Sequence, residues 1–278
     1  MDKNYFTLNE NFEGIIANSL NDKNVFKINP VSTGWTNIVF EAETNDGNYF
    51  FRFPRDDFWT RTIEKDCEFS NFINGKTYFN TVNLKLNRNE NRPFSIHKEI
   101  KGTVLADKMN DMTDEEIKAV SKEISEFMYE LHTTKFDKNE IFNTNRIGLN
   151  LVDFLNELIN IHLSDENKKF WKYKEFSKKD NTCLVHGDLN SSNILLDENN
   201  HIAGVIDFGF AGFGNKYFDI ARIIGRCPPK FKNAIIDSYE EISKEKLDYD
   251  VLDEEIKIWS DIDNGYINYM KQIGIYEV

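Results

Sequence analysis

One stretch of the sequence decides the fold, and it runs Leu184-Val185-His186-Gly187-Asp188-Leu189-Asn190-Ser191-Ser192-Asn193-Ile194-Leu195-Leu196, followed by Val205-Ile206-Asp207-Phe208-Gly209. It reads H-x-D-x-x-x-x-N and then D-F-G. The apolar runs 194–196 and 202–206, on either side of an Asp-Glu-Asn-Asn turn, predict a short hairpin. This hairpin would bring together the side chains of Asp188, Asn193 and Asp207. Asp, Asn, Gly and Ser are common in ordinary turns, but two such motifs in this order around a hairpin rarely arise by chance.

The spacing is that of a kinase catalytic loop followed by a magnesium-binding loop. Phosphoryl transfer needs a hydroxyl group aimed in line at the γ-phosphate and cations that hold the phosphate oxygens. We expect Asp188 to be the catalytic carboxylate that orients and deprotonates the hydroxyl. We expect Asn193 and Asp207 to supply the hard oxygen ligands that Mg²⁺ prefers. The predicted cofactors are therefore Mg²⁺ and a nucleoside triphosphate that donates the phosphate.

On these motifs the chain resembles the aminoglycoside phosphotransferase family, small-molecule kinases with a protein-kinase-like fold, and it is most similar to the 2″-phosphotransferases. Gly187 stands where protein kinases usually carry Arg, and no A-P-E motif follows D-F-G. The resemblance implies an α+β, two-lobed fold. An N-terminal lobe with an antiparallel sheet would bind the nucleotide over residues 1–97. A hinge at 98–102 would lead to a mainly helical C-terminal lobe, residues 103–278, with the catalytic loop and the substrate pocket.

Length and charge narrow the class of protein. The chain has 278 residues, enough for two lobes with their own cores, and 40% of them are hydrophobic. A net charge of −13 argues against a nucleic-acid partner, which would need Lys and Arg to neutralise phosphates. The same charge would attract a cationic small molecule. The alternative, which the net charge alone favours, is that an acidic surface simply keeps the protein in solution. No apolar run is long enough for a membrane span and the N-terminus lacks a signal-peptide core, so we expect a cytoplasmic protein with no membrane partner. We also expect the protein to be a monomer.

Strand patterns at 25–31, 37–44 and 49–53, with an Asn-Asp-Gly turn before the third, predict the start of an antiparallel sheet. Two more strands are expected at 82–86 and 94–100. The turn between the first two strands is rich in small hydroxyl residues and has one glycine, so its backbone N–H groups could approach phosphate oxygens. The resemblance makes this turn the nucleotide loop. Its candidate phosphate-binding residues are Ser32, Thr33, Gly34 and Thr36.

The third strand carries Arg52 where the resembled family has a phosphate-binding lysine. Arg and Lys are not interchangeable at a tight phosphate site. Either Arg52 takes the role with altered geometry, or the loop and the hinge hold more of the nucleotide, which leaves ATP and GTP both open as donors. A helical pattern over 60–73 offers Glu68 or Glu64 as the partner of Arg52. We expect Glu68, because the apolar pair that follows it resembles the family's.

The stretch Ile96-His97-Lys98-Glu99-Ile100-Lys101-Gly102 resembles the hinge between the lobes. Its backbone would hydrogen-bond the purine, with Ile96 and Ile100 as apolar neighbours. His97 lies between them and is counted with the nucleotide-contacting residues. It has no second ligand nearby, and we do not expect it to be catalytic.

Helical patterns dominate the rest of the chain. A capping box at 113–116 predicts a helix start, and further helices are expected at 151–159, 170–176, 230–244 and 250–272. Asp219, near the start of another helix, resembles a buried family aspartate that braces the catalytic loop.

Acidic residues gather in the last helices. Residues 237–263 contain eleven Asp or Glu and three Lys, a net charge of −8. The resembled family builds its substrate pocket here, and carboxylates near Asp188 would suit a sugar with several ammonium groups. The alternative is that these helix faces are ordinary solvated surface. The candidate substrate-binding residues are Asp188, Glu240, Glu241, Asp261, Asp263 and Tyr266.

The sequence therefore predicts a Mg-dependent transferase that phosphorylates a hydroxyl group of an aminoglycoside, with antibiotic resistance as the implied consequence. One alternative is a kinase of the same fold for another small molecule, such as a macrolide, choline, homoserine or a thio-sugar. A second alternative is a nucleotide-binding pseudokinase that acts as an interaction module. Arg52 is the only support for the pseudokinase, and the presence of Asp188, Asn193 and Asp207 argues against it.

Overall fold

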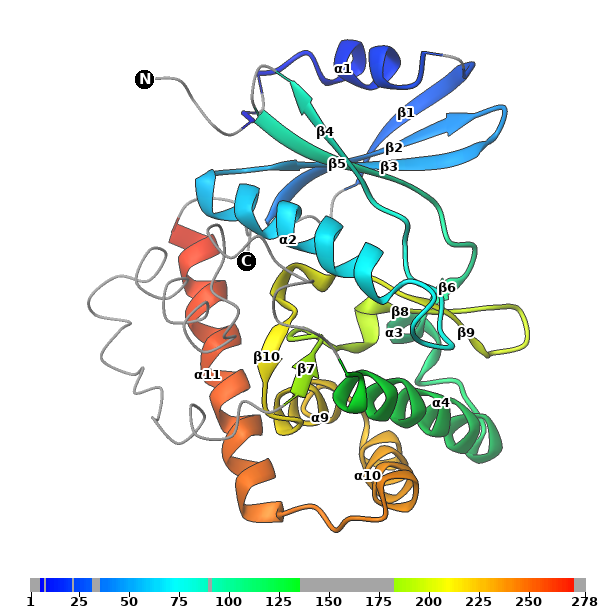
Figure 1. Ribbon diagram of the computed structural model, residues 1–278, viewed down its shortest axis with the longest axis vertical. Coiled ribbons are helices and arrows are strands. Elements are labelled where there is room, and N and C mark those ends of the chain that lie inside the picture. Colours follow the sequence, from blue (N-terminus) through cyan, green and yellow to red (C-terminus); the bar gives the residue numbers. More distant parts are fainter. Residues whose placement is uncertain are drawn as a thin grey trace.

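The fold is α+β, as the sequence predicted. Figure 1 shows an antiparallel sheet at one end of the molecule, a mainly helical part at the other, and the long helix α2 (Asp57–Ile73) under the sheet. The computed structural model describes residues 6–7, 9–21, 23–31, 36–89, 92–135 and 183–272.

Five antiparallel strands form the first sheet, in the order β1-β2-β3-β5-β4. A two-residue turn joins the second strand to the third, and Gly47 after it has a φ of 108°, a conformation that glycine adopts without strain. The strands and the hairpin predicted in this region are therefore confirmed. The bounds are β1 (Val25–Val31), β2 (Asn37–Thr44), β3 (Gly47–Pro54), β4 (Lys85–Asn89) and β5 (Arg92–Lys98).

The two faces of this sheet have different environments, because successive side chains of a strand point to opposite sides. Phe51, Phe53 and Ile96 are buried on the face that α1 (Phe12–Ser19) covers. Arg52 alternates with them and points to the other face, toward α2 and the helical part. Aromatic burial on one face of β3 thus turns the one cation of this strand, Arg52, toward the helical part.

The helical part begins after β5. Its short strands form two small sheets, β6-β8-β9 and β10-β7. The strand bounds are β6 (Thr103–Val104), β7 (Cys183–Val185), β8 (Ile194–Leu196), β9 (Ile202–Val205) and β10 (Gly212–Gly214). The helix bounds are α3 (Leu105–Lys108), α4 (Asp114–Thr133), α9 (Tyr217–Ile224), α10 (Pro229–Ser243) and α11 (Tyr249–Gln272).

The helices of this part bury their apolar faces around β7 and the D-F-G turn in one large core. The capping box predicted at the start of α4 is present, with the Thr113 hydroxyl and the Glu116 carboxylate each bonded to the other's backbone N–H. Among the residues described, no helix is both long and apolar enough to cross a membrane.

One predicted strand is displaced. A strand was expected at 82–86, whereas β4 starts at Lys85, because Val82 and Leu84 are buried against α2 with Ile63 and do not pair in the sheet. The helices expected at 151–159 and 170–176 lie outside the described residues, and the lobe boundaries at 97 and 102 stay a prediction.

The long helix α11 carries a buried acid. The side chain of Glu255 is 1% exposed, and its Oε2 atom has no hydrogen-bond partner among the residues described. Burial raises the pKa of Glu255 from 4.5 to about 7. The folded protein therefore binds this proton more tightly than the unfolded chain, and folding stability falls as the pH rises from 4.5 to about 7.

We expect Glu255→Gln to raise the melting temperature by several degrees at pH 8 and to change it little at pH 4.5, because the variant cannot ionise. Calorimetric unfolding at both pH values checks this. Glu241→Gln, on an exposed carboxylate of α10, is the matched control. An equal shift for Glu255→Gln at both pH values would contradict a buried acid with a raised pKa.

Candidate active site

A buried carboxylate holds the H-x-D loop. The side chain of Asp219, in α9, is fully buried; its two oxygens accept the backbone N–H groups of His186 at 2.8 Å and Gly187 at 2.9 Å. His132, from α4, lies 3.2 Å from the same carboxylate through Nε2. The bracing position expected for Asp219 is therefore confirmed.

Gly187 is required by this arrangement. Its φ is 80°, and a Cβ atom built on it would lie 2.2 Å from the carbonyl oxygen of Phe210. A larger residue would therefore meet both backbone strain and a clash with the backbone. The loop here has no room for the Arg that protein kinases usually carry at this position.

His186 connects the two motifs. Its Nδ1 accepts the backbone N–H of Asp188 at 3.2 Å, which places the ring proton on Nε2, and Nε2 donates to the carbonyl of Ile206 at 3.0 Å. The ring packs against Phe208, with 4.4 Å between centroids. The imidazole thus fixes the distance between the catalytic loop and the D-F-G turn.

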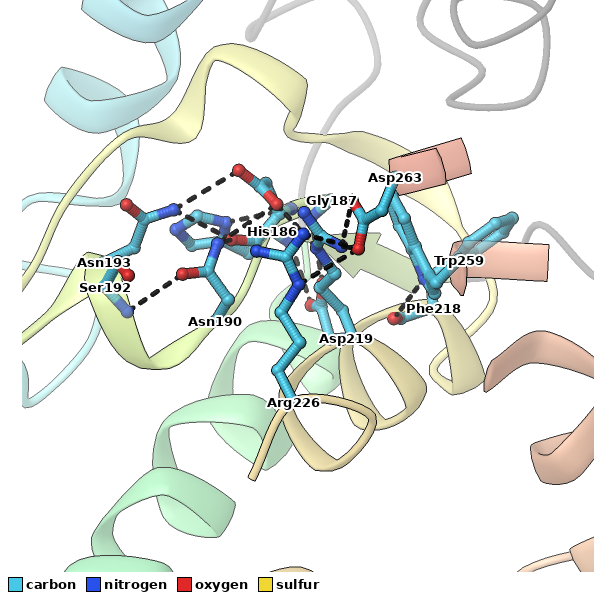
Figure 2. A network of polar contacts seen from close by, with 12 residues as sticks. His186, Gly187, Asn190, Ser192, Asn193, Phe218, Asp219, Arg226, Trp259 and Asp263 are labelled. Carbon is cyan, nitrogen blue, oxygen red and sulfur yellow. Dashed lines mark hydrogen bonds and ion pairs between the residues drawn. The ribbon is translucent and has the colours of Figure 1, made fainter. Parts of the chain in front are cut away.

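The hydrogen bonds to Asp188 reach its backbone carbonyl and its carboxylate, and the two carboxylate oxygens are not engaged equally. Asn193 Nδ2 donates to the Asp188 carbonyl at 2.9 Å, and Asn190 Nδ2 donates to the same carbonyl at 3.0 Å. Oδ1 accepts from Asn190 at 3.2 Å and from Arg222 Nε at 2.7 Å, whereas Oδ2 accepts from Asn193 Nδ2 at the longer distance of 3.5 Å. Oδ2 is therefore the oxygen that an incoming hydroxyl group would find less engaged. Figure 2 shows this network from close by.

The two predicted metal ligands fit Mg²⁺ bound together with phosphate. Asn193 uses its amide N–H₂ on the Asp188 backbone, which turns its carbonyl oxygen to the other side. Asp207 has a left-handed φ of 68°, and its side chain is 37% exposed. No group of three or more His, Cys, Asp or Glu side chains is placed for a metal in the part of the chain described. One carboxylate and one amide oxygen suit Mg²⁺, which takes few protein ligands and completes its shell with phosphate and water.

Arg52 pairs with two carboxylates. It forms an ion pair with Asp66 of α2, and its Nη2 lies 2.8 Å from Asp207 Oδ1. Asp66 is 1% exposed and also accepts the backbone N–H of Phe208 at 2.9 Å. Burial raises the pKa of Asp66; at Asp207, burial works in the same sense, but the attraction of the Arg52 guanidinium outweighs it and lowers the pKa.

The expected partner of Arg52 was wrong. Glu68 is exposed on α2, and Glu64 is paired with Arg88 at 2.7 Å. Residues two apart on a helix point to different sides, so Asp66 faces the strand while Glu64 and Glu68 do not. The pair is Arg with Asp, where a long cation compensates for a short carboxylate.

The other predicted nucleotide residues divide between two faces. Ile96 points into the core under α1, which corrects its expected place beside the purine. His97 is on the Arg52 face of the sheet, stacked on Phe50 at 5.4 Å, and burial lowers its pKa to about 4. Ile100 packs against the cluster under α2.

The phosphate loop is described only in part. Ser32, Thr33 and Gly34 lie outside the described residues. Thr36, directly before β2, accepts a hydrogen bond from Asn37 Nδ2 at 2.8 Å through its hydroxyl oxygen.

The acidic helices contribute one carboxylate to the network around Asp188. Asp263 of α11 reaches it through Arg222. Glu240 is buried at the corner between α10 and α11, the lower end of Figure 1, where it accepts the N–H of Leu247 at 2.9 Å and the hydroxyl of Tyr249 at 3.2 Å. This corrects the prediction that Glu240 binds the substrate, because its oxygens accept the hydrogen bonds that hold the connection between α10 and α11. Glu241 and Asp261 are exposed, and the side chain of Tyr266 is outside the described part.

Arg222 is the residue that sequence reasoning missed. It follows Asp219 by three positions, so both lie on one face of α9. Its guanidinium lies 4.5 Å over the ring of Trp259, in α11. The available signal was this spacing: a cation one helical turn after the bracing aspartate.

Comparison with known proteins gives a family model and several similar structures. Residues 27–254 match the model of a family described as the phosphotransferase enzyme family. The GDP and kanamycin complex of APH(2″)-IIia is similar with a TM-score of 0.69 and 18% identity, over 89% of this chain and 87% of that one. The gentamicin complex of APH(2″)-IIa is similar with a TM-score of 0.65 and 19% identity, over 96% of this chain and 92% of that one. A macrolide 2′-phosphotransferase from Brachybacterium faecium is similar with a TM-score of 0.61 and 14% identity, over 94% of this chain and 92% of that one. At these low sequence identities, the structural similarity shows that the proteins share a fold.

A reciprocal exchange tests the pair of Arg52 with Asp66. We expect Arg52→Lys alone to weaken Mg-nucleotide affinity roughly tenfold, or about 1.4 kcal/mol, because the shorter cation leaves Asp66 buried and unpaired. Adding Asp66→Glu should recover most of the loss, since the longer carboxylate restores the reach. Isothermal calorimetry measures both, with Arg88→Lys on the more exposed pair as control. A double variant that binds no better than Arg52→Lys would show that the lengths do not compensate.

Proposed function

The chain belongs to the phosphotransferase enzyme family, and we propose that it transfers the γ-phosphate of ATP or GTP to a hydroxyl group of an aminoglycoside. The observation that carries the proposal is the preorganised Asp188. Its backbone is fixed by Asn190 and Asn193, and Oδ1 is saturated by Arg222. The less engaged Oδ2 remains for the acceptor.

Each residue of the site has its own part in the proposed reaction. The acceptor hydroxyl donates a hydrogen bond to Asp188, and Asp188 takes the proton as the oxygen attacks the γ-phosphorus. The bond from the γ-phosphorus to the bridging oxygen breaks, and the nucleoside diphosphate leaves. Asn193 and Asp207 would hold Mg²⁺, which when bound neutralises charge on the phosphate oxygens. Arg52, close to Asp207, would contact the phosphates.

The choice of an aminoglycoside is supported by charge and by relatives. The net charge of −13 favours a cationic acceptor. Similar structures are complexes with kanamycin and gentamicin, and some hold GDP or ADP, which supports either GTP or ATP as the donor here. Phosphorylation would reverse the local charge of the drug and weaken its binding to ribosomal RNA, which would confer resistance.

A second candidate acceptor is a less charged molecule such as a macrolide. The observation in its favour is that Asp263 and Glu240 are already paired within the chain, and that macrolide phosphotransferases share the fold. An assay of nucleoside diphosphate release with kanamycin, gentamicin, a macrolide, choline and homoserine separates the candidates. Release that depends on kanamycin or gentamicin supports the proposal, and release with the macrolide alone would replace it.

Asp188→Asn tests the catalytic carboxylate. We expect turnover to fall by roughly 10²–10⁴-fold, the range for loss of a general base, with nucleotide affinity nearly unchanged, because the amide keeps the shape and loses the basicity. Steady-state kinetics and calorimetry measure the two effects. Turnover within twofold of the wild type would remove Asp188 from this role.

Salt dependence tests acceptor charge. We expect KM for kanamycin to rise several-fold from low to high salt, because the Debye length shrinks to about 8 Å at physiological ionic strength and screens the acidic surface. KM for the nucleotide should not rise to the same extent. Glu241→Gln combined with Asp261→Asn, both exposed, should move KM for kanamycin in the same direction as salt. A KM for kanamycin that does not change with salt would make the acidic surface irrelevant to substrate choice.

A further inference from the structure

We propose that Arg222 and Asp263 form a positioning pair for Asp188, and that Asp263 acts on catalysis through Arg222 rather than by binding the acceptor. The proposal rests on the proposed role of Asp188 in phosphoryl transfer and not on the identity of the acceptor. It assigns functions to a cation in α9 and to a carboxylate in the second half of α11.

The first observation is the geometry of the guanidinium. Arg222 Nε donates to Asp188 Oδ1 at 2.7 Å, and Nη1 donates to both oxygens of Asp263, at 2.9 and 2.8 Å. One planar group thus spans two carboxylates from different parts of the chain. A guanidinium presents its donors in a rigid fork, so fixing it on Asp263 also fixes the direction of Nε. The position of α11 therefore sets the orientation of the Asp188 carboxylate.

The second observation is that Arg222 is enclosed. Its side chain is 8% exposed, and the guanidinium stacks on the ring of Trp259. Trp259 is in turn fixed to α9, because its Nε1 donates to the carbonyl of Phe218 at 3.1 Å. Figure 2 shows Trp259 and Asp263 beside the catalytic loop, both from α11. A buried cation with an aromatic face and two carboxylates is held in one place, as a positioning group must be.

The third observation concerns Asp263. Both of its oxygens accept from Arg222, and Oδ2 also pairs with Arg226. The two carboxylates, Asp188 and Asp263, face two guanidiniums, so this corner of the site has no excess negative charge. An ammonium group of a substrate would have to displace a bidentate, partly buried ion pair to reach Asp263, at a cost of the same order as its own gain. Asp263 is thus suited to hold Arg222.

The test uses the full chain and three variants: Arg222→Gln, Asp263→Asn and their combination. We expect Asp263→Asn to lower kcat roughly 10–100-fold, by analogy with residues that orient the ligands of a metal ion, with KM for kanamycin and for the nucleotide within twofold of wild type. Arg222→Gln should lower kcat at least as much. The double variant should match Arg222→Gln alone, because a residue that acts through another adds nothing once that other is gone.

Controls separate positioning from folding. Arg222→Lys should recover only part of kcat, since an ammonium lacks the fork that reaches both carboxylates. Lys230→Gln removes an exposed cation of α10 that pairs with Asp114, and it should leave kcat unchanged. Calorimetric nucleotide affinity close to wild type shows that each variant is folded around the site. If Arg222→Gln does not fold, Asp263→Asn and Arg222→Lys still carry the comparison.

Two results would overturn the proposal. One is an increase in KM for kanamycin with Asp263→Asn at unchanged kcat, which would make Asp263 an acceptor ligand. The other is additive losses in the double variant. If the wild type transfers no phosphate to any aminoglycoside, the proposed function fails, and the same variants are compared by nucleotide hydrolysis with water as acceptor. Equal hydrolysis rates in all of them would then reject the positioning pair separately.

Discussion

Two consecutive backbone N–H groups converge on the buried carboxylate of Asp219, and the candidate site depends on that contact. A fully buried charge is tolerated only when hydrogen bonds replace its hydration, so the loop from His186 to Gly187 must keep its N–H groups turned inward. That curvature puts Gly187 in a positive φ, and it is what allows His186 to reach Asp188 and Ile206. The place of Asp188 follows from a helix that comes later in the chain.

Two guanidiniums then connect distant segments to the candidate site. Arg52 joins β3 to α2 and to the D-F-G turn, and Arg222 joins α9 to the catalytic loop and to α11. Each is largely buried and each serves two carboxylates. Removing one partner of such a group leaves an uncompensated buried charge, which costs far more than the pair contributes. The sheet, α2 and α11 are therefore coupled to the site by electrostatics as well as by apolar packing.

Local patterns in the sequence predicted the parts of the site that depend on neighbours in the chain. The H-x-D-x-x-x-x-N and D-F-G motifs, the hairpin between them and the strands around Arg52 are of this kind. The partner of Arg52 was missed because the rotation of α2 about its axis, which only packing sets, turns Asp66 and not Glu68 toward β3. Glu240 was assigned to the substrate pocket for a related reason. Charge density shows where carboxylates are numerous, but not which of them form hydrogen bonds within a helix connection. The role of Arg222 depends on the contact between α9 and α11, which brings Asp263 to its guanidinium and which the local sequence pattern does not show.

The proposed function requires that the loop around Asp188 moves a phosphoryl group onto an aminoglycoside. The most direct measurement is mass spectrometry of kanamycin and gentamicin after incubation with the protein, Mg²⁺ and ATP or GTP, with the nucleoside diphosphate quantified in the same samples. We expect a drug heavier by one phosphoryl group, formed in a one-to-one ratio with the diphosphate. Unmodified drug beside consumed nucleotide, or no consumption with either nucleotide, would contradict it.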